Sequence, residues 1–238
     1  MAGATNSFEG GSNGVAISTG NSGGLSGTAF DKISLDPFAD PPMDPLYSTA
    51  RAAHGTVSGL LNGGKGNGVG WDLSGSNSTR WVRAYLYKAG AWTGDVEIFI
   101  DMANGCYFAL RPGASNVLLR HYNNSSEATI ATIAVTPASG QWIRLELQAN
   151  NGAGGAAEAR LYNSADSLTP SGQASGSRAQ TASAWSSTNV FSSASADVWV
   201  DSVGWSDVDW LGSAAPVVPR PRSFIVGSSV AVHRTANW

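Results

Sequence analysis

The chain has 238 residues, of which 42% are hydrophobic and 13% charged, so it can bury a sizeable core with about half the usual share of charged residues. A net charge of −3 without any basic block excludes the electrostatic footprint of a nucleic-acid-binding protein. The single cysteine, Cys106, excludes an intrachain disulfide and is expected to be a small core residue of one large domain.

Short β-rich runs, bounded by Gly, Asn, Ser or Pro, recur along the chain, whereas helical periodicity is hard to find. This succession is typical of an antiparallel sandwich or barrel, so the sequence predicts an all-β fold. In chain order we expect strands at residues 15–19, 80–89, 95–101, 106–112, 116–123, 128–135, 141–149, 157–163 and 196–205.

Two of these runs, 80–89 and 141–149, alternate between apolar side chains and polar or aromatic ones. Ile143 and Leu145 share one face of the second run, which predicts that this face is core. The outer face of residues 80–89 mixes aromatic side chains with arginine, which indicates either a ligand-binding surface or the wall of a second packed layer. Trp92, in the turn-like run KAGAWTGD, is expected to be exposed. The candidate ligand contacts are Trp81, Arg83, Tyr85, Trp92 and Arg144.

Three segments lack a strand pattern of this kind. Residues 35–47 are proline-rich and cannot join a central strand. Residues 163–184 are small and polar, which predicts a long surface excursion. Residues 213–238 begin as a proline-rich linker and end in a segment too short to fold alone, so we expect it to dock onto a partner or a symmetry mate.

Signals for enzymatic chemistry, export and membrane insertion are sparse. Gly66 in GLLNGGKG stands where a phosphate-binding P-loop needs Ser or Thr, and the three histidines, His54 among them, lie in no metal-ligand spacing. Asp95, Glu97 and Asp101 share one face of a strand, so a hydrolytic carboxylate pair is geometrically feasible, but a solvated outer face is the favoured interpretation. No secretory signal and no apolar span are evident, which predicts no membrane insertion.

The two ends of the chain carry a family resemblance. The opening run NSFEGGSNGVAISTGNSGGLSGTAFD and the closing run ADVWVDSVGWSDVDW resemble concanavalin A-like or laminin G-like jelly-roll modules, as found in minor tail and other virion proteins of phages that infect actinobacteria. The resemblance covers about residues 5–212 and implies an antiparallel β-sandwich over residues 1–212. Hydrolases of the wider fold carry an ExDxxE strand motif that is missing here, which argues against glycanase activity.

The resemblance also implies that the first and last strands lie side by side, which would bring Glu9 near Asp201. Glu9 is then expected to accept hydrogen bonds from backbone amides or, together with Asp201, to bind a structural Ca²⁺ ion. No cofactor is required by this interpretation.

The function expected from these observations is that of a non-enzymatic virion protein. It would be made in the host cytoplasm and would present, as a minor tail protein, a jelly roll that binds a glycan or the host surface. Residues 213–238 would contact other virion proteins or make a homo-oligomer. The alternatives left open are a capsid decoration protein, a stand-alone carbohydrate-binding module, and a glycan-cleaving enzyme that uses the carboxylates of residues 95–101.

Overall fold

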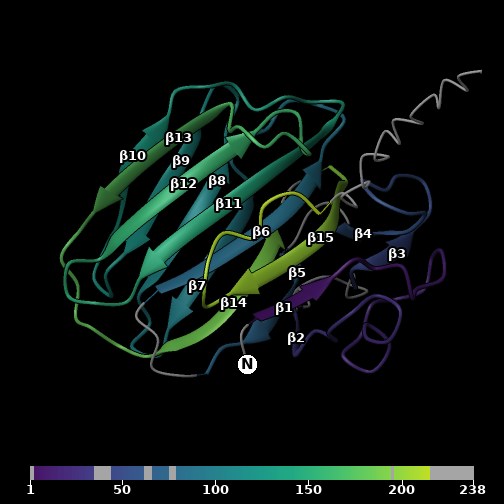
Figure 1. Cartoon of the computed structure of the whole chain (residues 1–238), viewed down its shortest axis with the longest axis horizontal. Coiled ribbons are helices and arrows are strands. Elements are labelled where there is room, and N and C mark those ends of the chain that lie inside the picture. Colours follow the sequence, from purple (N-terminus) through teal and green to yellow (C-terminus); the bar gives the residue numbers. More distant parts are fainter. Residues whose placement is uncertain (1–2, 35–43, 62–65, 75–78, 194–195, 215–238) are drawn as a thin grey trace, which may run out of the picture.

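The computed structural model describes residues 3–34, 44–61, 66–74, 79–193 and 196–214, and these form two antiparallel sheets that pack face to face (Figure 1). Sheet A follows the order β13 (Gly172–Ser177), β12 (Ala156–Tyr162), β11 (Trp142–Asn150), β6 (Thr79–Tyr87), β15 (Val198–Ser206), β4 (Ser58–Leu61) and β3 (Leu46–Ser48), with β1 (Gly3–Asn6) also paired to β15. Sheet B follows the order β10 (Glu127–Ile133), β9 (Val117–Tyr122), β8 (Tyr107–Pro112), β7 (Val96–Met102), β14 (Trp185–Ser192), β5 (Asn67–Asp72) and β2 (Lys32–Ser34). The prediction of an all-β antiparallel sandwich is confirmed.

The core lies between the two sheets and follows from the alternation of side chains along the strands. β11 turns Ile143 and Leu145 inward, β7 turns Ile98 and Ile100 inward, and all four are fully buried. Burial of such a side chain stabilises the fold by roughly 1.5–3 kcal/mol. Cys106 is buried at 1% exposure, as expected of a small core residue. Within the described ranges no helix is long and apolar enough to cross a membrane.

Eight of the nine expected strands are confirmed, with ends that differ by at most two residues. The strand expected at residues 15–19 is wrong, because only Ala16 makes an isolated bridge, to Leu46. Turns rich in glycine and asparagine flank this run, and among the described residues its backbone makes only two hydrogen bonds to the start of β3, from Ile17 N to Pro45 O at 2.7 Å and from Tyr47 N to Val15 O at 2.9 Å. Ile17 is nevertheless buried, as a loop residue.

The surface excursion expected at residues 163–184 is also wrong in part. β13 lies within it and pairs with β12 from Gly172 to Ser177. An edge strand needs few apolar side chains, because backbone hydrogen bonds along one side hold it in place. Gly176 is required here, since a Cβ atom would lie 2.3 Å from the carbonyl oxygen of Ile130 on β10.

The first and last strands of the chain lie side by side in sheet A. β1 pairs with β15 in the register Gly3↔Ser206 to Asn6↔Val203, so the predicted neighbourhood of the first and last strands is confirmed. β3 begins in the last two residues of the proline-rich run and is the outermost strand at its end of the main path of sheet A, in keeping with the expectation that this run cannot join a central strand. The expected docking segment falls largely on residues 215–238, which lie outside the described residues, and it stays a prediction.

Candidate functional site on the outer face of sheet A

Strand register brings polar and aromatic side chains together on the outer face of sheet A, because paired residues point to the same side of a sheet. Gln148 of β11 pairs with Trp81 of β6 and with Glu158 of β12. Four residues earlier on β11, Arg144 pairs with Tyr85. The covered half of this face consists of Arg83, Tyr85, Arg144, Glu146 and Tyr162, and the open half of Thr79, Gln148, Asn150, Ala156, Glu158, Ser175 and Ser177.

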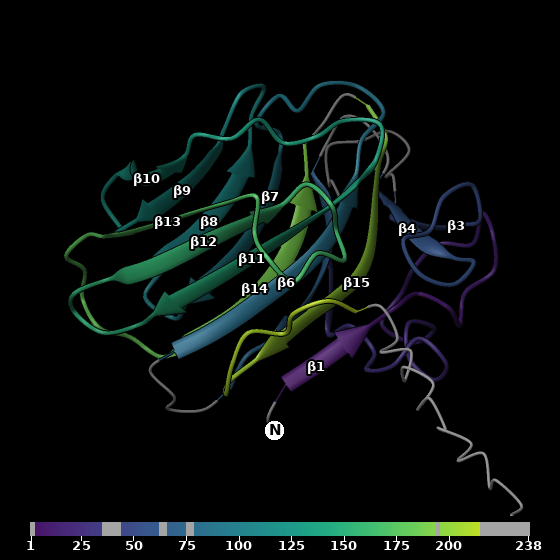
Figure 2. The same cartoon turned by 45° about the horizontal axis from the view of Figure 1, so that its top comes forward.

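Two segments of the chain lie over the covered half. Arg144 donates from Nη1 to the carbonyl oxygen of Ala165 at 2.6 Å and from Nη2 to that of Ser167 at 2.9 Å. Arg83 donates from Nη1 to the carbonyl oxygen of Gly212 at 3.0 Å. The segment after β15, in yellow, runs across this part of the sheet (Figure 2). Both guanidinium groups therefore hold residues 163–171 and 207–214 onto the sheet.

The hydroxyl of Tyr85 joins the two covering segments. It donates to Asp166 Oδ1 at 2.9 Å and accepts from the backbone N–H of Ala214 at 2.8 Å. Asp166 Oδ1 also lies 3.0 Å from His54 Nε2 and accepts from Ser213 Oγ at 2.9 Å. Burial alone would raise the pKa of Asp166, but the hydrogen bonds from Ser213 and Tyr85 bring that pKa below its usual value. A carboxylate is thus the common acceptor that closes this half.

A buried ion pair lies beneath the covering segments. The Nε of Arg144 lies 3.3 Å from Glu146 Oε1, and both side chains are 1% exposed. The Arg144 guanidinium also lies 3.7 Å above the ring of Tyr162, whose hydroxyl donates to Glu146 Oε2 at 3.2 Å. Arg144 therefore has charge, aromatic and carbonyl partners within the chain.

Asp201 and Glu9 both hold the loop between β3 and β4. Asp201 Oδ2 accepts from the backbone N–H groups of Ala53 at 2.8 Å and His54 at 3.0 Å. Glu9 Oε1 accepts from those of Thr56 at 2.9 Å and Val57 at 3.0 Å. The expectation that Glu9 serves as an acceptor for backbone amides is confirmed. Burial raises the pKa of Asp201 to about 6, although these amides and that of Ser202 oppose the rise.

The same contacts test whether Glu9 and Asp201 fit a Ca²⁺ ion. Each of their four carboxylate oxygens accepts an N–H or O–H group of the protein. Among the described residues, no group of three or more His, Cys, Asp or Glu side chains is placed to hold a metal. This donor set fits amides and does not fit a cation, so the Ca²⁺ ion stays a prediction without support from these contacts.

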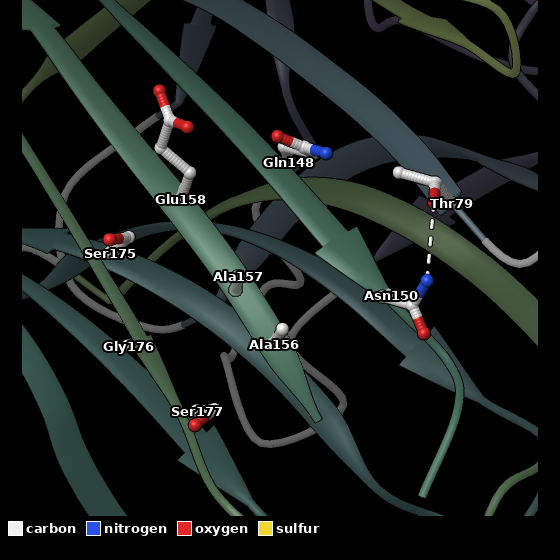
Figure 3. Close-up of a pocket in the computed structure, with 9 residues that line it drawn as sticks. All are labelled: Thr79, Gln148, Asn150, Ala156, Ala157, Glu158, Ser175, Gly176 and Ser177. Atoms are coloured by element: carbon white, nitrogen blue, oxygen red, sulfur yellow. Dashed lines mark hydrogen bonds between the residues drawn. The ribbon is translucent and has the colours of Figure 1, made fainter. Parts of the chain in front are cut away.

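The open half forms a hollow of about 510 Å³ between β6, β11, β12 and β13 (Figure 3). Its side chains are amides, hydroxyls and one carboxylate that point to the same side of the sheet. Asn150 Nδ2 donates to Thr79 Oγ1 at 3.3 Å, and Glu158 accepts from Arg160 Nε at 2.8 Å. Gln148 makes no side-chain hydrogen bond within the described residues, and Ala156 adds only a methyl group to the lining near Asn150. The hollow therefore offers hydrogen-bonding groups on rigid strands.

The candidate ligand contacts do not all lie on this face. Arg83, Tyr85 and Arg144 are brought together but are at most 5% exposed. Trp81 lies partly exposed at the border between the two halves, next to Gln148 in the register. The expected exposure of Trp92 is wrong, because it is 1% exposed and its Nε1 donates to the carbonyl oxygen of Ala138 at 2.8 Å. The turn that carries Trp92 folds its indole under the neighbouring loop.

The carboxylates of residues 95–101 face the other side of the sandwich, on sheet B. Glu97 pairs with Arg111, and Asp95 lies 3.2 Å from Lys88 Nζ. Ser187 Oγ donates to Asp101 Oδ2 at 2.7 Å. The shared outer face is confirmed, but these groups are engaged with neighbouring side chains and are only partly exposed.

Sequence reasoning missed His54 and Asp166 as members of one cluster. They are 112 residues apart, and each lies in a loop. No local spacing can reveal such a contact, because it depends on where two loops cross the sheet. Gln148 and Glu158, in contrast, follow from the alternation of β11 and β12 once the register is known.

Comparison with known proteins supports the fold. Neither a scan against models of protein families nor a search of curated proteins finds a match. Among solved structures, alginate lyase Aly36B is similar at 10% identity and a TM-score of 0.55, covering 88% of this chain and 98% of that one. An endo-β-1,4-glucuronan lyase from Trichoderma reesei is similar at 13% identity and 0.51, covering 85% and 94%. The cellulose-induced protein Cip1 is similar at 15% and 0.55, covering 87% and 98%.

At these levels of identity the likeness concerns the arrangement of the strands. In this chain that arrangement is two antiparallel sheets packed face to face, with the first strand paired to the last. The fold of this chain is a concanavalin A-like jelly-roll sandwich.

Proposed function

We propose that this chain binds a polar glycan on the open half of sheet A without cleaving it, and that it does so as an adhesion module of a virion, at the phage tail. The observation that carries the proposal is the hollow lined by Gln148, Asn150, Glu158 and hydroxyl side chains, with Trp81 at its border.

The chemistry of the hollow suits sugar hydroxyl groups. Around a sugar ring, amides accept and donate hydrogen bonds and a carboxylate accepts them, while an indole stacks on the apolar face of the ring. The lining side chains come from paired strands, so their positions are held by the backbone ladder rather than by loops. A hollow this open favours weak binding of one glycan by one chain. Several copies on one particle would raise the overall affinity through multivalent binding.

The covered half supports binding without cleavage. Arg83, Tyr85 and Arg144 are groups of the sheet itself that could stabilise charge or move a proton, and each is engaged with the chain's own carbonyl, amide or carboxylate groups. Glu158, the carboxylate of the hollow, is paired with Arg160. The open half thus lacks a second carboxylate opposite Glu158 among the residues that line it.

The test is a glycan-binding screen followed by calorimetry on the best glycan. Gln148→Ala and Asn150→Ala should each weaken binding about tenfold, the loss expected for one good hydrogen bond. Asn116→Ala removes a partly exposed amide on the β8–β9 turn of sheet B and should leave affinity unchanged. Equal affinity in the wild type and the three variants would show that the glycan binds elsewhere and would refute the proposed binding in this hollow.

Cleavage of an acidic polysaccharide is a second candidate, favoured by one observation. Two of the similar structures are named as lyases, and this chain places His54, from a loop, against Tyr85 on the sheet that also carries Arg83 and Arg144. Incubation with alginate and with glucuronan, followed by the ultraviolet absorbance of unsaturated products, separates the two. We expect no product, whereas product that disappears in Tyr85→Phe would establish the lyase and overturn the binding module.

The virion setting rests on the sequence resemblance. Mass spectrometry of purified particles of a phage that encodes this chain, with antibody labelling by electron microscopy, tests it. We expect the chain in the particle and the label at the tail; label on the head would favour a decoration protein, and absence from the particle would leave a stand-alone carbohydrate-binding module.

A further inference from the structure

A second hollow lies on the opposite side of the sandwich, on the outer face of sheet B. It has a volume of about 220 Å³ and lies over β7, β8 and β14. β8 and β9 lie behind β11 and β12 in Figure 1, so the core separates this hollow from the groove on sheet A. Its lining residues are Glu97, Phe99, Asp101, Tyr107 and Phe191.

Aromatic rings from three adjacent strands line this hollow. Phe99 lies at its centre, with ring centroids 6.5 Å from Tyr107 and 6.3 Å from Phe191. Tyr107 is held in place by stacking on Tyr122 at 5.3 Å. Ala109 of β8, which pairs with Phe99, adds only a methyl group to this face and is itself fully buried. The rings of Phe99, Tyr107 and Phe191 thus line the hollow and are available to a ligand.

Beside Phe99, the outer face of sheet B carries short side chains on β14 and β5. Asn189 pairs with Phe99 on one side and with Gly70 on the other. A Cβ atom on Gly70 would lie 2.3 Å from Asn189 Oδ1, so no larger residue fits there. The hollow is therefore bordered by side chains that the sheet itself positions.

The charges around the hollow are not balanced. Glu97 pairs with Arg111, whereas Asp101 makes no ion pair within the described residues. Asp101 Oδ2 accepts from Ser187 Oγ at 2.7 Å, and Oδ1 accepts no hydrogen bond from the described part of the chain. Lys32 is close enough to lower the pKa of Asp101, but its Nζ lies 2.8 Å from Asp72. The carboxylate of Asp101 is therefore available to pair with a positively charged ligand.

We propose that this hollow binds an organic ammonium group, which contacts the rings of Phe99, Tyr107 and Phe191 and pairs with Asp101. A cation over aromatic faces is attracted by their electron density, and more strongly where water is displaced. Burial raises the pKa of Asp101, and a bound cation would lower that pKa again. Quaternary ammonium groups and the protonated amine of an amino sugar share this chemistry.

The experiment compares choline with 3,3-dimethylbutan-1-ol, which has the same shape without the charge, by calorimetry on the full chain at low salt. We expect choline to bind at least tenfold more tightly. Glucosamine and N-acetylglucosamine form the second pair, in which acetylation removes the positive charge. Binding of glucosamine alone identifies an amino sugar as the source of the ammonium group, and binding of choline alone identifies a quaternary headgroup.

Variants assign the site. Asp101→Asn keeps an oxygen that can accept from Ser187 and removes only the charge, so it should fold and lose at least tenfold in affinity. Phe99→Leu should weaken binding severalfold, and thermal melting of each variant verifies the fold. Gln148→Ala, on sheet A, should leave ammonium binding unchanged, so this site can fail or succeed independently of the glycan groove.

Three results with the ligands and the Asp101 variant would overturn the proposal. They are equal binding of the charged and neutral analogues, unchanged affinity in Asp101→Asn, and no binding of either cation up to the millimolar concentrations at which such single contacts saturate. A Gln148→Ala variant that lost ammonium binding would move the site to sheet A and overturn it equally.

Discussion

The two halves of the outer face of sheet A differ in what they contact, although the same strands build both. In the covered half, Arg83, Tyr85 and Arg144 bind the chain's own segments and are buried. In the open half, Gln148 and Asn150 point into a hollow. Residues that attract attention in the sequence can thus serve the fold, and plainer polar residues beside them are the ones left to meet a ligand.

The difference has a structural cause. An arginine has five donors in a fixed arrangement, so a strand that presents one can capture several carbonyl oxygens of a passing loop. Residues 163–171 and 207–214 supply those carbonyls over β6 and β11. The ends of β11 and β12 near Asn150 and Ala156 lie beyond these contacts, and the face remains open there.

The largest effect expected is the loss of Arg144. Arg144→Ala removes its carbonyl contacts and leaves Glu146 buried without a cation, which should lower the free energy of unfolding by about 3–5 kcal/mol. Chemical denaturation measures it. Lys32→Ala, which breaks the exposed pair with Asp72, is the control and should cost about 0–1 kcal/mol. Similar losses of unfolding free energy in the two variants would mean that the contacts of Arg144 in the covered half do not stabilise the fold.

The next effect is a pH dependence from Asp201. Its folded pKa of about 6 lies above the usual 3.8, so the stability from this group is fully present below pH 3.8 and is lost as the pH rises through 6. Asp201→Asn cannot titrate, so its stability relative to the wild type should improve by about 3 kcal/mol between pH 3.5 and 7.5. Denaturation at several pH values measures this change, and a flat difference would contradict the raised pKa.

A smaller effect is expected for Glu9. Glu9→Ala leaves the amides of Thr56 and Val57 without their acceptor at a partly exposed site, which should cost about 1–2 kcal/mol, as for a lost helix cap. Thermal melting with Ca²⁺ and with a chelator should give the same midpoint for the wild type. A midpoint that rises with Ca²⁺ in the wild type but not in Glu9→Ala would show that the carboxylate binds the cation instead.

The smallest effect is expected in the open half. Gln148→Ala removes a partly exposed amide without a hydrogen bond among the described residues, so its free energy of unfolding should stay within about 0.5 kcal/mol of the wild type. Chemical denaturation of Gln148→Ala and Arg144→Ala under the same conditions compares the open half directly with the covered half. A loss above 1 kcal/mol would indicate that Gln148 supports the sheet and would weaken its assignment to ligand binding.

The sequence by itself determined the all-β class, most long strands and the inward faces of β6 and β11, because alternation with a period of two is a local property. It also indicated that the first and last strands meet, through the family resemblance. Strands with few apolar residues, such as β13, escaped it, since their pairing depends on backbone hydrogen bonds that any sequence can make.

Only the tertiary structure decided which half of the outer face is covered. The contacts of Arg144 with Ala165 and of His54 with Asp166 join a strand or loop to a distant loop, and no spacing in the sequence encodes where that loop crosses. The burial of Trp92 beneath its neighbouring loop has the same origin. Side-chain direction is set within a strand, whereas exposure is set by whatever other part of the chain lies on top.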